Sequence, residues 1–235
     1  MSTDKLNLST FLLSSIHDMK NSLGVMASYL EDALAEGVGQ GPVDTPARRR
    51  TAQALYEAQR VNNHLIQLLA LYKIDQAFYP FDPQDQPLCD LAQEALARAR
   101  PLAESEGIAL DCDYPENLYG WLDYELVFGV VVQALHNALH YTKSRVRLTF
   151  EANNEIGATG IVIRVEDDGP GYPDFLLAQG NGAQQGINFN TGSTGLGLYF
   201  ADVVARMHQA GGKIGRIHLA NGGQLGGGRF SLELP

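Results

Sequence analysis

Two glycine-rich segments decide the fold, Val165-Glu-Asp-Asp-Gly-Pro-Gly171 and Gly192-Ser-Thr-Gly-Leu-Gly197. We expect the first to close a strand and the second to lead into a helix. A helix start presents unpaired backbone N–H groups and the positive end of the helix dipole, and both attract phosphate oxygens. Asp167 can accept a hydrogen bond from an adenine amino group, while Gly169 and Gly171 let the backbone lie close to the base. Glycines are also typical of an ordinary turn, but the two segments in this order favour a nucleotide site.

Upstream of these segments, another candidate residue lies in an apolar helical stretch, Gln133-Ala-Leu-His-Asn-Ala-Leu-His-Tyr-Thr142. Asn137 carries an amide oxygen, a hard ligand that suits a Mg²⁺ ion bridging nucleotide phosphates. A helix asparagine is also often just a hydrogen-bonded polar group of the core. The sequence therefore leaves both roles open for Asn137.

The patterns around these motifs indicate a two-layer α/β sandwich without an internal repeat. Helices are expected near residues 88–106, 123–141 and 195–209. Strands are expected near residues 108–112, 119–122, 146–151, 161–166, 213–219 and 229–234. Residues 172–191 show no clear periodicity, and loops of this length in compact domains are usually functional lids or disordered segments.

The N-terminal region is expected to form an antiparallel helical hairpin. From Leu12 to Ala33 the apolar positions alternate in steps of four and three, which is a heptad seam. A second helix carries an apolar stripe on the same spacing, which consists of Leu55, Ala58, Leu65, Leu69 and Tyr72 and is widened by Val61 and Leu68. Glycines and prolines in residues 37–46 separate the two helices. Because two such helices cannot cover each other's apolar faces, we expect a homodimer with a four-helix bundle, the alternative being packing against the rest of the chain.

His17 lies one position past Ile16 of the seam, so its ring faces the flank of the bundle, where another domain can reach it. A lone histidine on such a helix is most often structural. The neighbours of His17 favour phosphoryl chemistry instead. Asp18 offers a carboxylate that holds or removes the ring proton, and Asn21 lies one turn along on the same face.

Composition excludes several classes of protein. A formal net charge of −10 and a pI near 5.0 argue against a nucleic-acid-binding surface, and the cluster Arg48-Arg49-Arg50 is typical of a solvated helix face. Cys89 and Cys112 have neither the spacing of a zinc site nor that of a disulfide framework. The longest apolar run, Leu126 to Leu135, is too short to span a membrane, and the N-terminus has no signal core. We expect a cytoplasmic protein with no membrane association.

The motifs, taken in order, resemble the sensor histidine kinases of two-component systems. The sequence around His17 is similar to the H-box of that family, the stretch around Asn137 to its N-box, and Asp167 to Gly171 to its D-x-G-x-G motif. The resemblance implies a hairpin for dimerisation and histidine phosphotransfer (1–75), a linker (76–87) and a catalytic domain of the Bergerat type (88–235), the fold shared by histidine kinases, gyrase and chaperone ATPases. The chain departs from the pattern at Gln133, where Asn is common, and at His140, where Lys or Arg is common.

The resemblance also implies the roles of individual residues. His17 is implied as the phosphoacceptor, Asp18 as the general base and Asn21 as the residue for dephosphorylating the partner. ATP is implied as the cofactor with Mg²⁺ on Asn137, and the nucleotide-binding residues are implied as Asn137, His140, Tyr141, Asp167, Gly169, Gly171, Gly192, Thr194, Gly195, Leu196 and Gly197. The implied partners are a second copy of the chain and the receiver domain of a response regulator. Only sixteen residues precede His17, so we expect the signal to come from a separate sensory or regulatory protein.

Two other functions stay open at this point. A Bergerat-fold ATPase of the gyrase, mismatch-repair or chaperone type would couple hydrolysis to a conformational cycle. Such enzymes place a glutamate four residues before the Mg²⁺ asparagine, and here that residue is Gln133, which cannot act as a base. A phosphotransfer or scaffold protein with an inactive nucleotide domain is the third reading, and the intact motifs speak against it.

Overall fold

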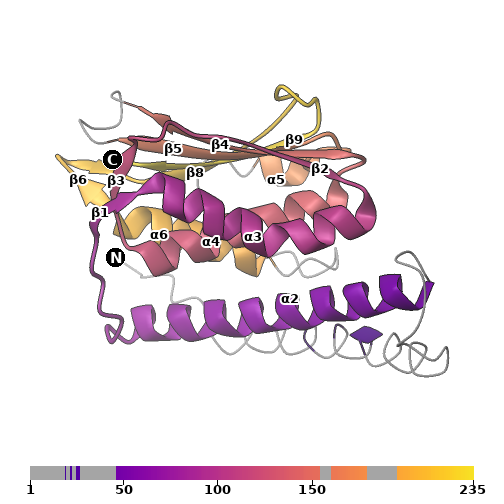
Figure 1. Cartoon of the computed structure of the whole chain (residues 1–235). Coiled ribbons are helices and arrows are strands. Elements are labelled where there is room, and N and C mark those ends of the chain that lie inside the picture. Colours follow the sequence, from indigo (N-terminus) through magenta and orange to yellow (C-terminus); the bar gives the residue numbers. More distant parts are fainter. Residues whose placement is uncertain (1–18, 20–21, 23–24, 27–45, 154–159, 179–194) are drawn as a thin grey trace. The chain divides into compact units, whose positions relative to one another are not determined.

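The structure is a computed structural model that describes residues 19, 22, 25–26, 46–153, 160–178 and 195–235 (Figure 1). The chain divides into two compact units, Met1–Tyr79 with Ile187–Leu196 and Pro80–Gly186 with Gly197–Pro235. In the described part of the chain, no helix is both long and apolar enough to cross a membrane.

The first unit is built on helix α2 (Pro46–Asp75). Proline suits the first position of a helix, because its missing N–H would have no partner there, and Lys73 lies near the negative end of the helix dipole. The helix ends where Ala77 adopts a φ of 55° and the Phe78 N–H turns back to the carbonyl of Lys73, 2.7 Å away. The four described residues of the preceding segment, Met19, Ser22, Val25 and Met26, are helical, as the seam predicts.

A hydrogen bond links described residues of the two helical segments of this unit. The guanidinium of Arg60 in α2 donates to the hydroxyl of Ser22, which is itself buried. Burial, and then the nearby charge of Arg60, lower the pKa of His64 to about 4, so this imidazole is neutral at physiological pH. His17, Asp18 and Asn21 lie outside the described residues.

The apolar stripe of α2 is only partly buried within a single chain. Val61 and Leu68 are buried, but Leu65, Leu69 and Tyr72 of the predicted stripe are exposed by 50%, 54% and 48%, and Ile66 beside them is exposed by 53%. Large apolar side chains grouped on one helix face usually mark an interaction surface.

The second unit is a two-layer α/β sandwich, as the sequence predicts. Its main sheet has the strand order β2-β4-β5-β9-β8. These strands are β2 (Ala109–Asp113), β4 (Arg145–Ala152), β5 (Ile161–Asp167), β9 (Gly228–Leu234) and β8 (Arg216–Asn221). Strands β2 and β4 run parallel, and the other neighbours run antiparallel.

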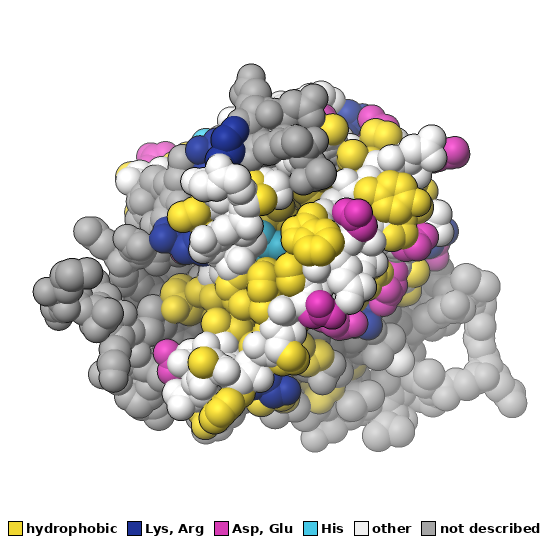
Figure 2. Space-filling view, turned by 90° about the vertical axis from the view of Figure 1, so that its left-hand side faces the viewer, with side chains coloured by type: hydrophobic (Ala, Val, Ile, Leu, Met, Phe, Trp, Pro, Cys, Tyr) yellow, Lys and Arg dark blue, Asp and Glu magenta, His cyan; other side chains and the backbone are white. Residues whose placement is uncertain are grey.

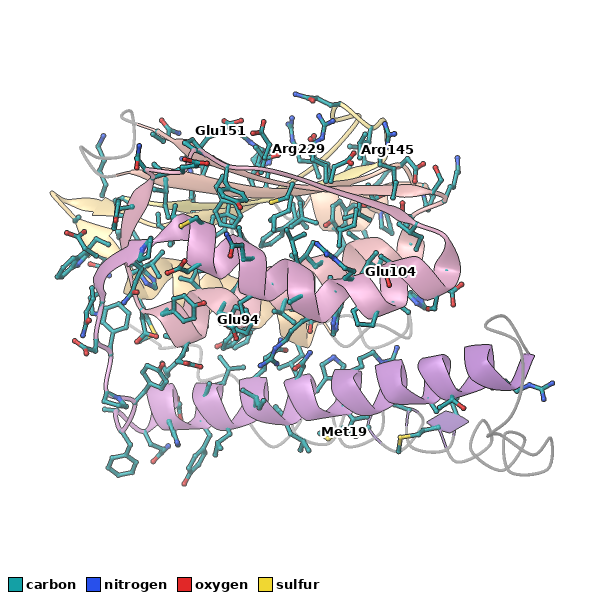
Figure 3. All side chains as sticks on the ribbon, viewed as in Figure 1. Met19, Glu94, Glu104, Arg145, Glu151 and Arg229 are labelled. Atoms are coloured by element: carbon teal, nitrogen blue, oxygen red, sulfur yellow. The ribbon has the colours of Figure 1, made fainter. Side chains whose placement is uncertain are left out.

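Helices α3 (Leu88–Glu106), α4 (Tyr124–Tyr141) and α6 (Leu196–Met207) cover one face of the sheet (Figure 1). The core between the layers consists of fully buried side chains, among them Leu88, Leu91, Leu135, Leu148, Phe150, Ile161, Ile163, Leu232 and Leu234. On the other side of the sheet, Arg145, Glu151 and Arg229 project away from α3 (Figure 3). This face carries ion pairs, such as Arg164 with Glu151 and Arg216 with Glu233.

Several short elements differ from the sequence-based expectation. Strand β1 (Gln84–Pro87) lies in the stretch that we expected to be a linker, and it pairs antiparallel with β3 (Tyr119–Leu122). A proline is acceptable there because β1 is an edge strand. Helix α5 (Asp174–Ala178) lies near the start of the expected loop, whose residues 179–191 are outside the described part.

The last predicted helix ends two residues earlier than expected, and the single strand predicted after it is two strands, β7 (Lys213–Ile214) and β8 (Arg216–Asn221). Helix α6 ends at Met207, and Gln209–Ala210 form β6, which pairs with β7 across two glycines in the left-handed region. Gly215 then separates β7 from β8, because its N–H donates to the His208 carbonyl. A Cβ atom at Gly215 would lie 2.4 Å from the Ala205 carbonyl oxygen, so the chain passes too close to α6 to continue as one strand.

The edge of the sandwich near β1, β3 and β6 exposes apolar side chains. Tyr119, Trp121 and Ile214 are exposed, and Figure 2, which views the molecule from this side, shows hydrophobic side chains at the surface with acidic groups beside them. Trp121 is the single tryptophan of the chain. Its fluorescence therefore reports selectively on unfolding of this unit.

His208 joins the end of α6 to the start of α4. Its buried ring donates from Nδ1 to the Val204 carbonyl (2.8 Å) and accepts at Nε2 from the Asp123 N–H (3.0 Å), while the ring of Phe81 packs edge-on at 5.1 Å. Asp123 also caps α4, because its carboxylate accepts from the N–H groups of Leu126 and Asp82. Burial lowers the pKa of His208 below its ordinary value of 6.5, although the Val204 carbonyl and the charge of Asp123 act in the opposite direction.

This neutral histidine predicts a loss of stability in mild acid. Above pH 6.5 the imidazole is neutral in both the folded and the unfolded chain, and its contribution to stability is complete. As the pH falls below 6.5 only the unfolded chain takes up the proton readily, so the free energy of unfolding falls by at most about 1.4 kcal/mol per pH unit. Urea unfolding followed by Trp121 fluorescence at pH 7.0 and pH 5.5 measures this fall. It should shrink in His208→Gln, and an undiminished fall in that variant would contradict the assignment.

Candidate nucleotide site

The site is built around Asp167, the last residue of β5, whose side chain is almost entirely buried. One carboxylate oxygen, Oδ1, accepts hydrogen bonds from the backbone N–H groups of Gly169 (2.8 Å) and Gly228 (3.1 Å). Burial raises the pKa of this carboxyl above its usual range, although the two N–H groups act to lower it. Both of these hydrogen bonds use Oδ1, so one oxygen holds the carboxylate in place and the other, Oδ2, can accept from a ligand donor.

The turn after Asp167 packs directly against the end of α4. A Cβ atom at Gly169 would lie 2.3 Å from the Tyr141 carbonyl oxygen and 2.9 Å from Oδ1 of Asp167. The sequence predicts that this glycine lets the backbone lie close to the base. The structure adds an intramolecular reason, since only glycine lets the turn lie against α4. The same contact places the end of α4 beside the turn that follows Asp167.

Asp168 has a role that the sequence analysis did not find. Its carboxylate accepts from the hydroxyls of Thr142 (2.5 Å) and Ser144 (2.6 Å). It also accepts from the N–H groups of Lys143, Ser144 and Arg145. Although burial acts to raise it, these hydrogen bonds hold the pKa of Asp168 well below its ordinary value. Asp168 therefore fixes the α4–β4 turn beside the site.

Asn137 belongs to a small polar group between α4 and the start of α6. Its Oδ1 accepts from Nε2 of Gln133 at 3.1 Å, and a Cβ atom at Gly197 would lie 2.8 Å from Cγ of Gln133. Gly197 is thus needed for α6 to approach α4 at the level of Gln133. One turn further along, His140 and Tyr141 are exposed, and their rings pack edge-on at 4.7 Å.

The glycine-rich segment 221–228 is a second feature that the sequence analysis missed. It connects β8 to β9 and lies against the turn after Asp167. The Gly227 N–H donates to the Asp167 carbonyl (3.0 Å), and a Cβ atom at Gly227 would lie 2.5 Å from that oxygen. Five glycines in eight residues were a signal in the sequence, because such density marks a close backbone approach.

Comparison with known proteins agrees with this geometry. Residues 123–235 match the family described as "Histidine kinase-, DNA gyrase B-, and HSP90-like ATPase". The match contains Asn137, Asp167, Gly169, Gly171 and Gly197. This part of the chain is therefore similar to the ATPase domains of that family. The Bergerat sandwich and the family resemblance expected from the sequence are confirmed.

Related sequences extend beyond this domain. Over 96% of its length the chain is 29% identical to "Sensor-like histidine kinase SenX3" of Mycobacterium tuberculosis, and it covers 53% of that protein. Over 84% of its length it is 25% identical to "Sensor histidine kinase WalK" of Bacillus subtilis, of which it covers 33%. The chain therefore spans about half, or less, of these curated relatives.

Solved structures with low sequence identity share the fold. The Acinetobacter baumannii histidine kinase AdeS aligns with a TM-score of 0.60 at 14% identity, covering 93% of this chain and 96% of that chain. The catalytic domain of histidine kinase ThkA aligns with a TM-score of 0.54 at 22% identity, covering 66% of this chain and 97% of that chain.

The oxygen donors of this site fit a Mg²⁺ ion that would be held mainly by nucleotide phosphates. In the residues that the structure describes, no three His, Cys, Asp or Glu side chains converge into a metal site. Mg²⁺ usually keeps several waters and takes one or two protein oxygens plus phosphate oxygens, so a single amide oxygen fits it. The carbonyl oxygen of Asn137 has two lone pairs, and Gln133 uses one of them.

The structure places some predicted site residues and not others. Gly195 has a φ of 64° directly before α6, and Leu196 is the first residue of that helix. Gly192 and Thr194 lie outside the described residues, as does the phosphoacceptor candidate His17. The roles assigned to individual residues therefore remain predictions.

Proposed function

We propose that the chain is an ATP-dependent protein-histidine kinase that phosphorylates itself on His17 and passes the phosphoryl group to an aspartate in the receiver domain of a response regulator. The observation that carries the proposal is Asp167, a buried carboxylate held by Gly169 and Gly228 in a domain of the histidine kinase family. Relatives named sensor histidine kinases match almost the entire chain, including the region of His17.

In the proposed reaction, Asp167 accepts a hydrogen bond from the adenine amino group, and the start of α6 receives the phosphates. Asn137 would hold Mg²⁺, and the ion would supply positive charge to neutralise the phosphates. Asp18 takes the proton from one ring nitrogen of His17 while the other attacks the γ-phosphorus in line, and ADP leaves. Because the transition state of phosphoryl transfer is loose, most of the catalysis comes from positioning and charge neutralisation. Asn21 orients water for dephosphorylation of the partner.

The structure adds an argument against a gyrase-type ATPase. Gln133 occupies the position where those enzymes need a base, and its amide donates to Asn137 instead. An amide cannot remove a proton from water at neutral pH. A scaffold with an inactive nucleotide domain is also disfavoured, because the hydrogen bonds around Asp167 are intact.

We further propose that two copies of the chain pair through the hairpin. The exposed apolar side chains of α2, Leu65, Ile66, Leu69 and Tyr72, suit the core of a four-helix bundle. A separate sensory or regulatory protein would supply the signal. A cytoplasmic location would give the kinase access to ATP and to receiver domains.

The fate of the γ-phosphate tests the proposal against both alternatives. The full chain is incubated with Mg²⁺ and γ-labelled ATP, and protein-bound label and free phosphate are measured over time. A kinase accumulates label on the protein, approaching one phosphoryl group per chain at most. Steady release of phosphate without labelled protein would support the ATPase, and the absence of both products together with the absence of ATP binding would support the scaffold.

A further inference from the structure

Asn221, the last residue of β8, makes an unusual pair of contacts with the residue that follows the D-x-G-x-G motif. Its side-chain oxygen Oδ1 accepts from the Tyr172 N–H at 2.7 Å, and its Nδ2 donates to the Tyr172 carbonyl at 2.9 Å. The side chain therefore satisfies both backbone polar groups of a single residue, as a neighbouring strand would do.

Gly171 lies directly under this contact. It has a φ of +80°, and a Cβ atom there would lie 2.6 Å from Oδ1 of Asn221. Both facts require glycine, the first because L-residues avoid this region and the second because a side chain would push Asn221 away. The second glycine of the motif thus leaves room for Asn221.

The backbone partner of Asn221 holds the other end of the same turn. Asn221 and Gly228 face each other across β8 and β9, and the Gly228 N–H donates to Oδ1 of Asp167. One pair of opposite residues therefore fixes both Asp167, at the entry of the turn, and Tyr172, at its exit. Two backbone hydrogen bonds stabilise the loop between Asn221 and Gly228. The Gly222 N–H donates to the Gly227 carbonyl, and the Gly226 N–H donates to the Gly223 carbonyl.

We propose that Asn221 is a positioning residue for nucleotide binding. It holds residues 167–172 in the one conformation that presents the Asp167 carboxylate to the base, and it does so without touching the nucleotide. This inference rests on the proposed function, since it assumes that Asp167 binds ATP. Without Asn221 the turn is held at its Asp167 end only, and the binding-competent conformation is populated for a fraction of the time. The apparent affinity for ATP falls in proportion to the population of that conformation, whereas the rate of phosphoryl transfer from bound ATP is unchanged.

The test compares the KM for ATP and the kcat of autophosphorylation in the full chain. Asn221→Ala should raise the KM about tenfold and leave kcat within about twofold. Asn221→Asp should raise it as much, because a carboxylate oxygen would then face the Tyr172 carbonyl. Asn117→Ala, at an exposed asparagine in the turn between β2 and β3, is the matched control and should change neither constant.

Gly171→Ala separates positioning from general damage. Alone, it should raise the KM, because its methyl group displaces the Asn221 side chain. Combined with Asn221→Ala, it should add less than its separate effect, since only the backbone strain at Gly171 then remains. Full additivity of the two substitutions would overturn the proposal.

Two results distinguish this inference from the proposed function. If Asp167→Asn loses ATP affinity while Asn221→Ala keeps the wild-type KM, the positioning role is wrong and the kinase assignment stands. If Asp167→Asn binds ATP like the wild type, the assumed base contact fails and the positioning role fails with it. A fall in kcat at saturating ATP without a change in KM would also overturn the positioning role.

Discussion

Asp167→Asn is expected to weaken ATP binding by about 100-fold. Oδ1 of Asp167 already accepts from two backbone N–H groups, so the asparagine must place its own oxygen there. Its NH₂ group then occupies the position of Oδ2 and faces the amino group of adenine. The asparagine NH₂ and the adenine amino group are both donors and cannot hydrogen-bond to each other. The hydrogen bond to the carboxylate is therefore lost, and the adenine amino group is left unpaired.

Calorimetric titration of the full chain with ATP in Mg²⁺ measures this change. Asp85→Asn in β1, which removes the same charge from an exposed position, is the control and should bind like the wild type. An Asp167→Asn variant that keeps its affinity within a factor of three of the control would show that Asp167 does not bind the base.

Gly169→Ala is expected to destabilise the catalytic unit by about 3 kcal/mol and to abolish measurable ATP binding. Its methyl group would lie 2.3 Å from the Tyr141 carbonyl oxygen. That oxygen belongs to the backbone at the end of α4, so it cannot move aside as a flexible side chain can. The turn and the helix must separate, and the carboxylate of Asp167 loses the N–H of Gly169 as they do.

Gly211→Ala is a suitable comparison for this stability change. Gly211 also has a positive φ, 57°, but a Cβ atom there would meet nothing within 4 Å. Its substitution should lower the free energy of unfolding by only about 1 kcal/mol, because alanine is less stable than glycine in the left-handed conformation. Urea unfolding monitored by Trp121 fluorescence measures both variants. Equal losses would show that close packing on α4 is not what requires Gly169.

The sequence predicted the long elements of the catalytic unit well, because their signals are local. The apolar pattern gave the span of α3 and, within a residue, that of α4 and β5. Asp167 became a candidate because glycines follow it, and Asn137 became one because of its place in an apolar helical stretch. The early end of α6 was missed because the contact between Gly215 and Ala205 that requires it is tertiary.

The parts of the site that the sequence did not predict depend on contacts between distant residues. Asp168 holds Ser144, 24 residues away, and Asn221 holds Tyr172, 49 residues away. No hydrophobic period or turn signal links such pairs, since each residue alone is typical of an ordinary loop. Strand β1 was missed for a similar reason, because its proline content hides a strand that only pairing with β3 defines.

The central claim is that His17 receives the γ-phosphoryl group of ATP held by the catalytic domain. The most direct measurement is labelling of the full chain with γ-labelled ATP and Mg²⁺, with the wild type, His17→Ala and Asn137→Ala side by side. The account predicts a label on the wild type that is stable to base and lost in acid, as a phosphoramidate is, with no label on either variant. His17→Ala should still bind ATP like the wild type. An equally labelled His17→Ala, or a wild type that binds ATP and never acquires such a label, would contradict it.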